Sequence, residues 1–418
     1  MSNMSASVPR AAVPTDRHAR IEATFTVNSP VTRRELLAGR TQALQQLLEL
    51  AAQPGRHAVV FGERAMGKTS LATVLPEFHG GAMSLVWVSA EAGDTFSTLW
   101  RRAAVSVRTS LRRAERGLAS SSYPSDTPTT LGQDGEVSVS EALALLGRLT
   151  ETVPAWVVFD AFENVTDSGT RAAMRELAEA TEPAAPRATL VFAGRGQSGD
   201  DLMEPSASLV PVRVGRFTND ESVECVLRSL RQVSMAADDV VVERIALLAN
   251  GMPHAVQALA RAAARDAAGA GSGHLESLNL QAGMHEALDE APAEVREAYE
   301  QATVRARRGI YPEILLACAL APRDEHGFFS VAAVCETVTR IVHREVRGLT
   351  NQVSALTEAG RGAVLVKQGA AKTARYRFVD PRLEPYILVR GLEEGWATHH
   401  AAAWLPGLAE AEELAHAA

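Results

Sequence analysis

Cysteine is rare in this sequence. The 418 residues include only 3 cysteines, and these lie in apolar, helix-forming stretches without a CxxC pair. This pattern argues against a disulfide framework and against a cysteine zinc site, and it is typical of small buried side chains in a reducing compartment. Aromatic residues are also sparse, at 5% of the chain. The cysteines are Cys225, Cys318 and Cys335.

Long hydrophobic runs are missing as well. No apolar run approaches the ~18 residues that a membrane-spanning helix needs, and the N-terminus lacks the charged and then apolar pattern of a secretory signal. We therefore expect a cytoplasmic protein without membrane contact. The net charge of −8 argues against a surface that binds nucleic acid throughout, but it allows a local basic patch.

Five apolar runs alternate with helical patterns in the first half of the chain. Such alternation predicts an α/β fold, with a parallel sheet and helices on both of its faces. From residue 218 to about 363 clear strand patterns are absent, which predicts a helical region. The chain is too long for one typical core, so we expect two or three domains. The apolar runs begin at His57, Met83, Ala155, Ala188 and Leu209.

The strongest motif is the stretch from Gly62 to Thr69. It has the spacing GxxxxGK[ST], follows an apolar strand and opens a helical pattern, as the phosphate loop of a nucleoside-triphosphate site does. Backbone N–H groups of such a loop bind phosphate at a helix N-terminus. Lys68 suits the β- and γ-phosphate oxygens, and the Thr69 hydroxyl suits Mg²⁺. We expect nucleotide contacts from Gly62, Glu63, Arg64, Ala65, Met66, Gly67, Lys68, Thr69 and Ser70.

Asp160 ends a second apolar strand. In phosphate-loop enzymes such an aspartate holds Mg²⁺, which makes Thr69 and Asp160 the candidate metal ligands. A glutamate that orients the attacking water usually follows directly, but here the next residue is Ala161. Glu163 could replace it, or could be a carboxylate at a helix start or on the surface. Because loss of the orienting base costs ~10²–10⁴ in rate, we expect slow hydrolysis.

Two further positions are candidates for sensing the nucleotide. Arg195 follows the strand that begins at Ala188, where a cation could reach the γ-phosphate, although it could equally be a surface residue of a loop. Pro253 suits the first turn of a helix. His254 could touch the nucleotide from the helical region, although a lone histidine more often has a structural role.

Four segments carry a family resemblance: Leu37–Arg40, Gly62–Thr69, Val157–Asp160 and Gly251–His254. Together they resemble the AAA+/STAND ATPases, in particular the branch of origin-recognition initiators and transposon-associated ATPases. The resemblance covers about residues 30–395 and implies ATP and Mg²⁺ as ligands. It also implies that Gly39 and Arg40 contribute to the adenine side, and that Gly251 to His254 couple a helical lid to the nucleotide state.

Two residues depart from the family pattern. Ala161 stands where the family has glutamate, and Ala65 stands where it tends to have glycine. We expect alanine at position 65 to be tolerated if the backbone there keeps a negative φ. The organisation expected from the sequence is a disordered leader over 1–28, an ATPase core over 29–217, a helical lid over 218–285, a winged-helix domain over 286–395 and a helical tail over 396–418.

The winged helix is expected from the order helix, helix, helix, strand, strand between residues 309 and 389. A helix over 344–358 would bury Leu349, Val353 and Leu356 on one face. Residues 305–380 contain twelve Lys or Arg against seven Asp or Glu, a net charge of +5 that favours the DNA backbone. The candidate DNA contacts are Arg344, Arg347, Asn351, Gln352, Lys367, Lys372, Arg375 and Arg377.

The leading functional hypothesis is a switch ATPase whose nucleotide state controls DNA binding by the winged helix. One alternative is a signalling or assembly protein, in which the winged helix contacts protein and the nucleotide controls homo-oligomer formation. Another is a pseudo-ATPase with little turnover, which the alanine at position 161 suggests.

Overall fold

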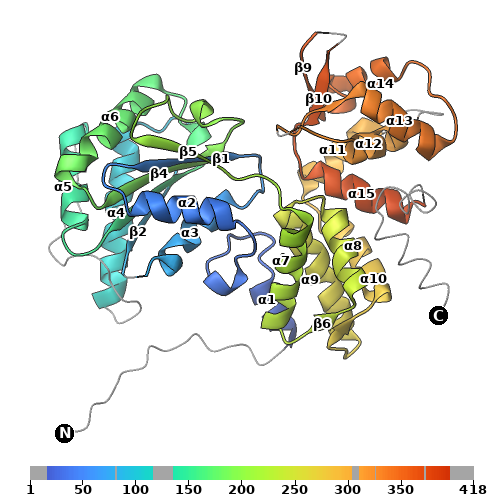
Figure 1. Ribbon diagram of the computed structural model, residues 1–418, viewed down its shortest axis with the longest axis horizontal. Helices are drawn as coiled ribbons and strands as arrows, with labels where there is room; N and C mark the ends of the chain where they lie inside the picture. The colour runs from blue at the N-terminus through green and yellow to red at the C-terminus, as the bar shows by residue number, and fades with distance from the viewer. Residues whose placement is uncertain are drawn as a thin grey trace, which may run out of the picture. The chain divides into compact units, whose positions relative to one another are not determined.

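The computed structural model describes residues 17–80, 82–115, 135–303, 310–324, 326–370 and 373–395. The described residues divide into two compact units, which are best considered one at a time. Pro30–Phe217 form one unit, and the described residues before and after that stretch form the other. We call them the α/β unit and the helical unit (Figure 1). None of the helices in the described ranges is long and apolar enough to cross a membrane.

A five-stranded sheet forms the centre of the α/β unit. Its strand order is β2-β3-β4-β1-β5, and every neighbouring pair is parallel, which confirms the expected parallel sheet. The three central strands, which begin at His57, Ala155 and Ala188, are buried almost throughout, as strands covered on both faces should be. Their bounds are β1 (His57–Gly62), β2 (Ser84–Ser89), β3 (Ala155–Asp160), β4 (Ala188–Arg195) and β5 (Leu209–Arg213).

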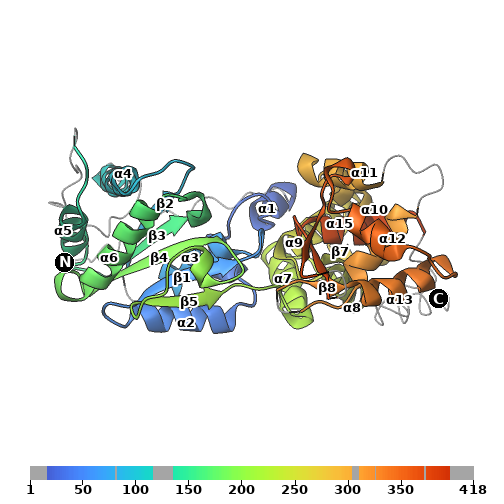
Figure 2. The ribbon, with the colours of Figure 1, turned by 90° about the horizontal axis from the view of Figure 1, so that it is seen from above.

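Helices cover both faces of this sheet (Figures 1 and 2). Val59, Val157 and Phe159 point to the face on which α4, α5 and α6 build an apolar core. On the opposite face, Trp156 Nε1 donates a hydrogen bond of 3.0 Å to Ala72 O of α3. The helices are α2 (Thr41–Ala51), α3 (Lys68–Phe78), α4 (Phe96–Glu115), α5 (Val139–Leu149) and α6 (Ser168–Ala184).

The helical unit begins with a helix that the sequence did not predict. Residues 17–28 were expected to belong to a disordered leader, but α1 (Arg17–Thr24) buries Ile21, and Phe25 just beyond it is buried too. Residues 1–16 lie outside the described part. A short parallel pair of strands also appears in a region where none was expected. The other elements are α7 (Asn219–Gln232), β6 (Ala236–Ala237), α8 (Asp239–Ala249), α9 (Pro253–Gly269), β7 (His274–Leu275) and α10 (Ser277–Asp289).

The last described elements combine helices with a small antiparallel sheet of order β8-β10-β9. The helix that ends at Asp289 is separated from the next, which begins at Ala293, by a short connection that contains Pro292. The tail over 396–418 lies outside the described residues. The elements are α11 (Ala293–Thr303), α12 (Tyr311–Leu320), β8 (Phe329–Ser330), α13 (Val331–Val342), α14 (Leu349–Ala355), β9 (Leu365–Gln368), β10 (Arg375–Phe378) and α15 (Leu383–Glu393).

The helix expected over 344–358 is shorter than predicted. Left-handed backbone at His343, with φ 53°, ends α13, and Gly348, with φ 71°, precedes the first residue of α14. Arg344 and Arg347 therefore lie in the connection rather than on the helix. Leu349, Val353 and Leu356 are buried, as the spacing predicted.

Candidate nucleotide site

The predicted nucleotide residues meet at the carboxyl ends of β1, β3 and β4. Gly62 ends β1, Asp160 ends β3, and Arg195 at the end of β4 pairs in register with Gly62. This edge of a parallel sheet is where α/β proteins bind ligands. Gly62 must lack a side chain here, because a Cβ atom would lie 2.2 Å from Val214 O.

The loop between β1 and α3 has two residues in left-handed conformation, Ala65 with φ 63° and Gly67 with φ 85°. The condition under which alanine was expected to be tolerated, a negative φ at Ala65, is therefore not met. Gly67 is the N-cap of α3, and no side chain caps it. The N–H groups of the first turn of α3 thus have no side-chain acceptor at the cap, an arrangement that suits a phosphate anion.

Lys68 is folded back over this loop. Its Nζ donates to Gly62 O at 3.0 Å and to Glu63 O at 2.6 Å, and the residue is only 9% exposed. Burial lowers the pKa of the ammonium from 10.5 to about 8, while the carboxylates of Glu163 and Asp160 act in the opposite direction. Its two hydrogen-bond acceptors are neutral carbonyls, and a bound phosphate would replace them with charged oxygens.

Thr69 and Asp160 are directly joined. Thr69 Oγ1 donates a hydrogen bond of 2.9 Å to Asp160 Oδ2. Burial raises the pKa of the Asp160 carboxyl, and the hydrogen bond from Thr69 opposes that rise. A hydroxyl and a carboxylate side by side are oxygen ligands of the kind that Mg²⁺ prefers. These residues therefore fit the ATP and Mg²⁺ that the sequence implies.

Glu163 and Arg195 form an ion pair with each other. Arg195 donates to the Glu163 carboxylate twice, from its backbone N at 2.9 Å and from Nε at 2.5 Å. Ala161 has φ 55° and begins a 3-10 helix over Phe162–Asn164, which turns Glu163 toward β4. Glu163 lies close enough to Lys68 and Asp160 to act on the pKa values of both.

Gly194 makes this approach possible. A Cβ atom at that position would lie 2.7 Å from Glu163 Oε2. The sequence suggested Glu163 and Arg195 separately, but it did not indicate their pairing or the part played by Gly194.

Arg40 contacts the phosphate loop through its side chain. Its Nη2 donates a hydrogen bond of 2.7 Å to Met66 O, and its guanidinium lies 4.4 Å from the centre of the Phe217 ring. Arg40 is 8% exposed, and both it and Gly39 have left-handed backbone. Sequence reasoning missed Phe217, for which no motif gave a signal. The contact of Gly39 and Arg40 with adenine stays a prediction.

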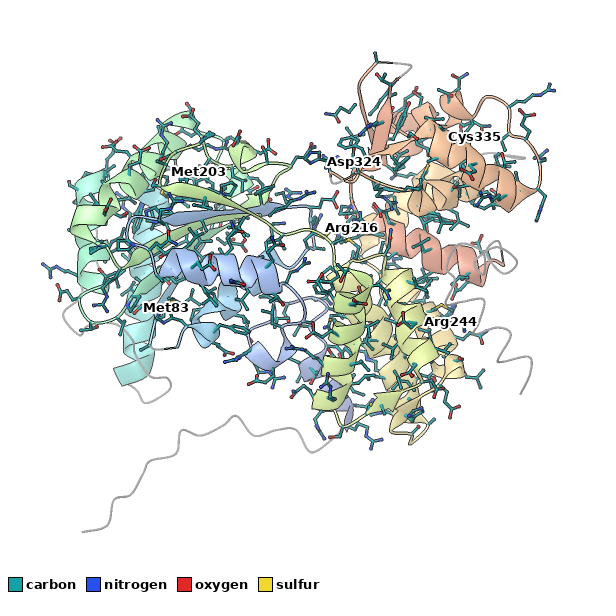
Figure 3. All side chains as sticks on the ribbon, viewed as in Figure 1. Met83, Met203, Arg216, Arg244, Asp324 and Cys335 are labelled. Carbon is teal, nitrogen blue, oxygen red and sulfur yellow. The ribbon has the colours of Figure 1, made fainter. Side chains whose placement is uncertain are left out.

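The remaining loop residues have varied surroundings. Glu63 lies 3.4 Å from the guanidinium of Arg216, which is labelled in Figure 3. Ser70 Oγ accepts a hydrogen bond of 3.0 Å from Val31 N. Met66 is buried, and Arg64 is exposed.

Pro253 and His254 lie at the start of α9 in the helical unit, so their role toward the nucleotide stays a prediction.

The predicted DNA contacts are spread over α14, the connection before it, and the β9–β10 hairpin. Asn351 is exposed on α14, while Gln352 is half-buried. Arg375 donates a hydrogen bond of 2.6 Å to Asp324, which is labelled in Figure 3. The guanidinium of Arg377 lies 5.1 Å from the centre of the Phe328 ring. Lys367 is exposed on β9, and Lys372 lies outside the described residues.

Comparison with known sequences places the site in a family. Residues 36–191 match the family described as AAA ATPase domain. This part of the chain is an AAA ATPase domain. The match covers the phosphate loop, Asp160 and Glu163, and it confirms the ATPase resemblance for that stretch. No protein of curated function matches the sequence.

Several solved structures resemble this chain at low sequence identity. The Walker-type ATPase of Pyrococcus abyssi superposes with a TM-score of 0.54 at 18% identity, over 87% of this chain and 99% of that chain. The Cdc6p structure from Pyrobaculum aerophilum gives 0.47 at 18% identity, over 89% and 98%. The ORC2 protein of Aeropyrum pernix, in ADPNP and ADP complexes, gives 0.49 at 14% identity, over 91% and 98%. The first of these likenesses supports the fold of the AAA ATPase domain.

Proposed function

We propose that the protein is a nucleotide-controlled switch that binds ATP with Mg²⁺ and hydrolyses it slowly. The observation that carries this proposal is the hydrogen bond between Thr69 and Asp160 beside the buried Lys68, at the end of a parallel sheet. These three side chains supply the cation and the hard oxygen ligands that a metal–triphosphate needs. Bound Mg²⁺ would neutralise part of the phosphate charge.

In this proposal Lys68 exchanges its two carbonyl acceptors, Gly62 O and Glu63 O, for phosphate oxygens. Thr69 and Asp160 hold the metal, and the N–H groups at the start of α3 hold phosphate. Arg40 keeps the Met66 carbonyl turned away from the phosphates through its hydrogen bond. Each role uses a donor or acceptor that already points into the loop region.

Glu163 is the residue we assign to orienting the attacking water, in place of the glutamate missing at position 161. Its carboxylate lies in the site but is held by Arg195. Hydrolysis therefore requires the ion pair between Arg195 and Glu163 to break. A phosphate near Arg195 offers the guanidinium another anionic partner. This competition gives a physical reason for slow turnover.

For the second half of the helical unit we propose a winged helix that binds DNA according to nucleotide state. The order α12, β8, α13, α14, β9, β10 and the basic composition of residues 305–380 support it. Asn351 on α14 and Lys367 on β9 are exposed and would contact DNA.

A second candidate function is nucleotide-controlled assembly through protein contacts. It is favoured by the partners that two of the expected DNA cations already have, Asp324 for Arg375 and the Phe328 ring for Arg377. Under this alternative, ATP changes the homo-oligomeric state and DNA does not bind. A cytoplasmic location belongs to both proposals, and the buried free cysteines Cys225 and Cys318 support it.

The test measures ATP affinity and DNA affinity on the same preparations. The wild type should bind Mg²⁺–ATP, and Lys68→Ala should lose that binding while its thermal unfolding without nucleotide stays close to the wild type. DNA affinity is measured at several salt concentrations, with and without ATP. It should depend on the salt concentration and on the presence of ATP. The assembly function would be supported instead by two results together. DNA affinity would be independent of salt and of ATP, and light scattering would show a mass that changes with ATP.

A further inference from the structure

An ion pair lies near the end of each of the two strands that flank β1. The order β4-β1-β5 places β1, which leads into the phosphate loop, between the other two strands. On one side Arg195 ends β4 and pairs with Glu163. On the other side Arg216 follows β5, and its Nη2 lies 3.4 Å from Glu63 Oε2. All four residues belong to the α/β unit.

We propose that Arg216 distinguishes a triphosphate from a diphosphate, and that Glu63 holds its guanidinium while no triphosphate is bound. A terminal phosphate then replaces the Glu63 carboxylate as the anionic partner of Arg216. This inference rests on the proposed nucleotide switch. It adds a second arginine of the same chain to the site, which neither the phosphate-loop motif nor the family comparison assigns.

The backbone on both sides of Arg216 is attached to the α/β unit close to the phosphate loop. Val214 N donates a hydrogen bond of 2.8 Å to Phe61 O, one residue before the loop begins. The Phe217 ring lies 4.4 Å from the guanidinium of Arg40, which itself donates to the loop. The backbone of Arg216 is thus held beside the loop, while its long side chain can change partner by changing rotamer.

The Glu63 end of the loop is also the end that the lysine ammonium reaches. Lys68 is the first residue of α3, but its Nζ lies against Gly62 O and Glu63 O, where the loop starts. In phosphate loops the backbone N–H groups hold the inner phosphates, and the lysine reaches the β- and γ-phosphates. The terminal phosphate is therefore expected near Glu63, on the side where Arg216 lies.

Charge favours this exchange of partners. The distance of 3.4 Å between Arg216 and Glu63 is longer than the about 2.7–2.9 Å of a strong charge-assisted hydrogen bond. Their side chains are 22% and 23% exposed, so solvent weakens the attraction further. A triphosphate next to Lys68 would repel the Glu63 carboxylate and attract the guanidinium. A diphosphate lacks the terminal group, so Arg216 keeps Glu63 as its partner.

The test compares the affinities for a diphosphate and for a triphosphate. Mg²⁺–ADP and the Mg²⁺ complex of adenylyl imidodiphosphate, a triphosphate analogue that is not hydrolysed, are titrated into the full chain by calorimetry. The pH is 6.5, well below the pKa of about 8 that burial gives Lys68, so its ammonium stays charged.

Arg216→Gln should lower the affinity for the triphosphate analogue by about 10- to 100-fold, because a charge-assisted hydrogen bond to phosphate is lost. The affinity for ADP should change little. The matched control is Arg148→Gln, which removes the same charge from an exposed position of α5 and should change neither affinity. Thermal unfolding without nucleotide shows whether each variant is folded.

Glu63→Gln is a second test, which remains informative if Arg216→Gln fails to fold. It removes the carboxylate that competes for Arg216 and repels the triphosphate, so the affinity for the triphosphate analogue should rise while that for ADP changes less. A purely structural ion pair predicts the opposite sign. Its loss would disturb the loop and lower both affinities.

The outcomes separate this inference from the proposed function. A wild type that binds neither nucleotide refutes the switch and, with it, the role of Arg216. If the wild type binds both nucleotides, equal losses of the two affinities in Arg216→Gln, or no loss of either, refute the role of Arg216 alone. A lower affinity of Glu63→Gln for the triphosphate analogue also refutes it, because Glu63 then supports phosphate binding instead of competing with it.

Discussion

Asn250 Nδ2 donates a hydrogen bond of 3.0 Å to Glu384 Oε2, which joins the turn after α8 to the first turn of α15. Glu384 is 2% exposed, and the same oxygen lies 3.1 Å from Arg323 Nη2. Arg323 in turn donates to the last carbonyls of α12, Cys318 O and Ala319 O. One buried carboxylate thus connects three elements of the helical unit that are far apart in sequence.

Removing that carboxylate should destabilise the helical unit. Glu384→Ala removes a buried carboxylate that lies 3.1 Å from the largely buried Arg323 guanidinium, so the free energy of unfolding should fall by about 3 kcal/mol. Urea unfolding of the wild type, Glu384→Ala, Arg323→Ala and the double variant measures the coupling. Glu297→Ala, at an exposed position of α11, is the control and should change little. Additive losses in the double variant would show that the pair is not coupled.

Turnover should depend on Glu163 and not on residue 161. Glu163→Gln should lower the rate of ATP hydrolysis by about 10²–10⁴ while ATP affinity remains, because the orienting carboxylate is lost and the fold around Arg195 is kept. Ala161→Glu should not raise the rate, since Glu163 already supplies a carboxylate close to Lys68 and Asp160. Single-turnover phosphate release measures both. A faster Ala161→Glu variant would instead identify a degenerate ATPase that lacks only that residue.

Glycine should fit position 65 at least as well as alanine does. Left-handed backbone costs an alanine about 1–2 kcal/mol, whereas glycine at such a position costs about 0.5–1 kcal/mol in unfolded-state entropy. Ala65→Gly should therefore raise the free energy of unfolding by up to about 1.5 kcal/mol. Ala172→Gly, at an exposed position of α6, is the control and should lower it by about 1 kcal/mol. Equal losses in both variants would show that Ala65 is not strained.

Features that depend on neighbouring residues in the chain could be predicted from the sequence. The phosphate loop, the five strands and the strand-terminal Asp160 each have a local signal, in spacing or in an apolar run, and the parallel sheet places their ends together. The pairing of Glu163 with Arg195 has no such signal. It depends on a left-handed alanine at position 161 and on space at Gly194, and neither feature can be inferred from residue type alone.

The errors in the helical unit have a similar cause. α1 is only 8 residues long, too short for a clear helical period, and it is stabilised by packing of Ile21 and Phe25 against other helices. The helix predicted over 344–358 begins too early. Its prediction includes Gly348 as a helical residue, whereas Gly348 has a left-handed backbone and precedes the first residue of α14. Tertiary packing therefore determines both the presence of α1 and the residue at which α14 begins.

Stability should fall in mild acid because of His57. This residue is 0% exposed, and its Nδ1 accepts a hydrogen bond of 3.0 Å from Leu190 N, so the neutral ring with hydrogen on Nε2 fits the site. Burial lowers its pKa from 6.5 to about 4. Between these pH values the unfolded chain binds a proton that the folded protein does not, so the free energy of unfolding falls by about 1.4 kcal/mol per pH unit as pH decreases.

Urea unfolding at several pH values between 4 and 7.5 measures this effect. Carboxylates titrate in the same acid range, so the informative quantity is the difference in slope between the wild type and His57→Gln. The variant cannot take up the proton and should have the shallower slope. Parallel slopes would assign the acid sensitivity to other groups.

ATP affinity should fall in mild alkali because of Lys68. Without nucleotide its pKa is lowered to about 8, so below that pH the ammonium is already charged and phosphate binding takes up no proton. Above it the folded site holds a neutral amine that must regain a proton to bind phosphate, and affinity should fall by up to about tenfold per pH unit. Titration with ATP between pH 7 and 9.5, at constant Mg²⁺ and ionic strength, measures the profile. Lys68→Arg is the matched control, since arginine stays charged throughout. Its affinity can be lower, because the guanidinium is larger, but it should not change with pH. A wild-type ATP affinity that does not change with pH would mean that the site keeps the Lys68 ammonium charged without phosphate. An equal decline of ATP affinity with pH in Lys68→Arg would assign the titration to another group.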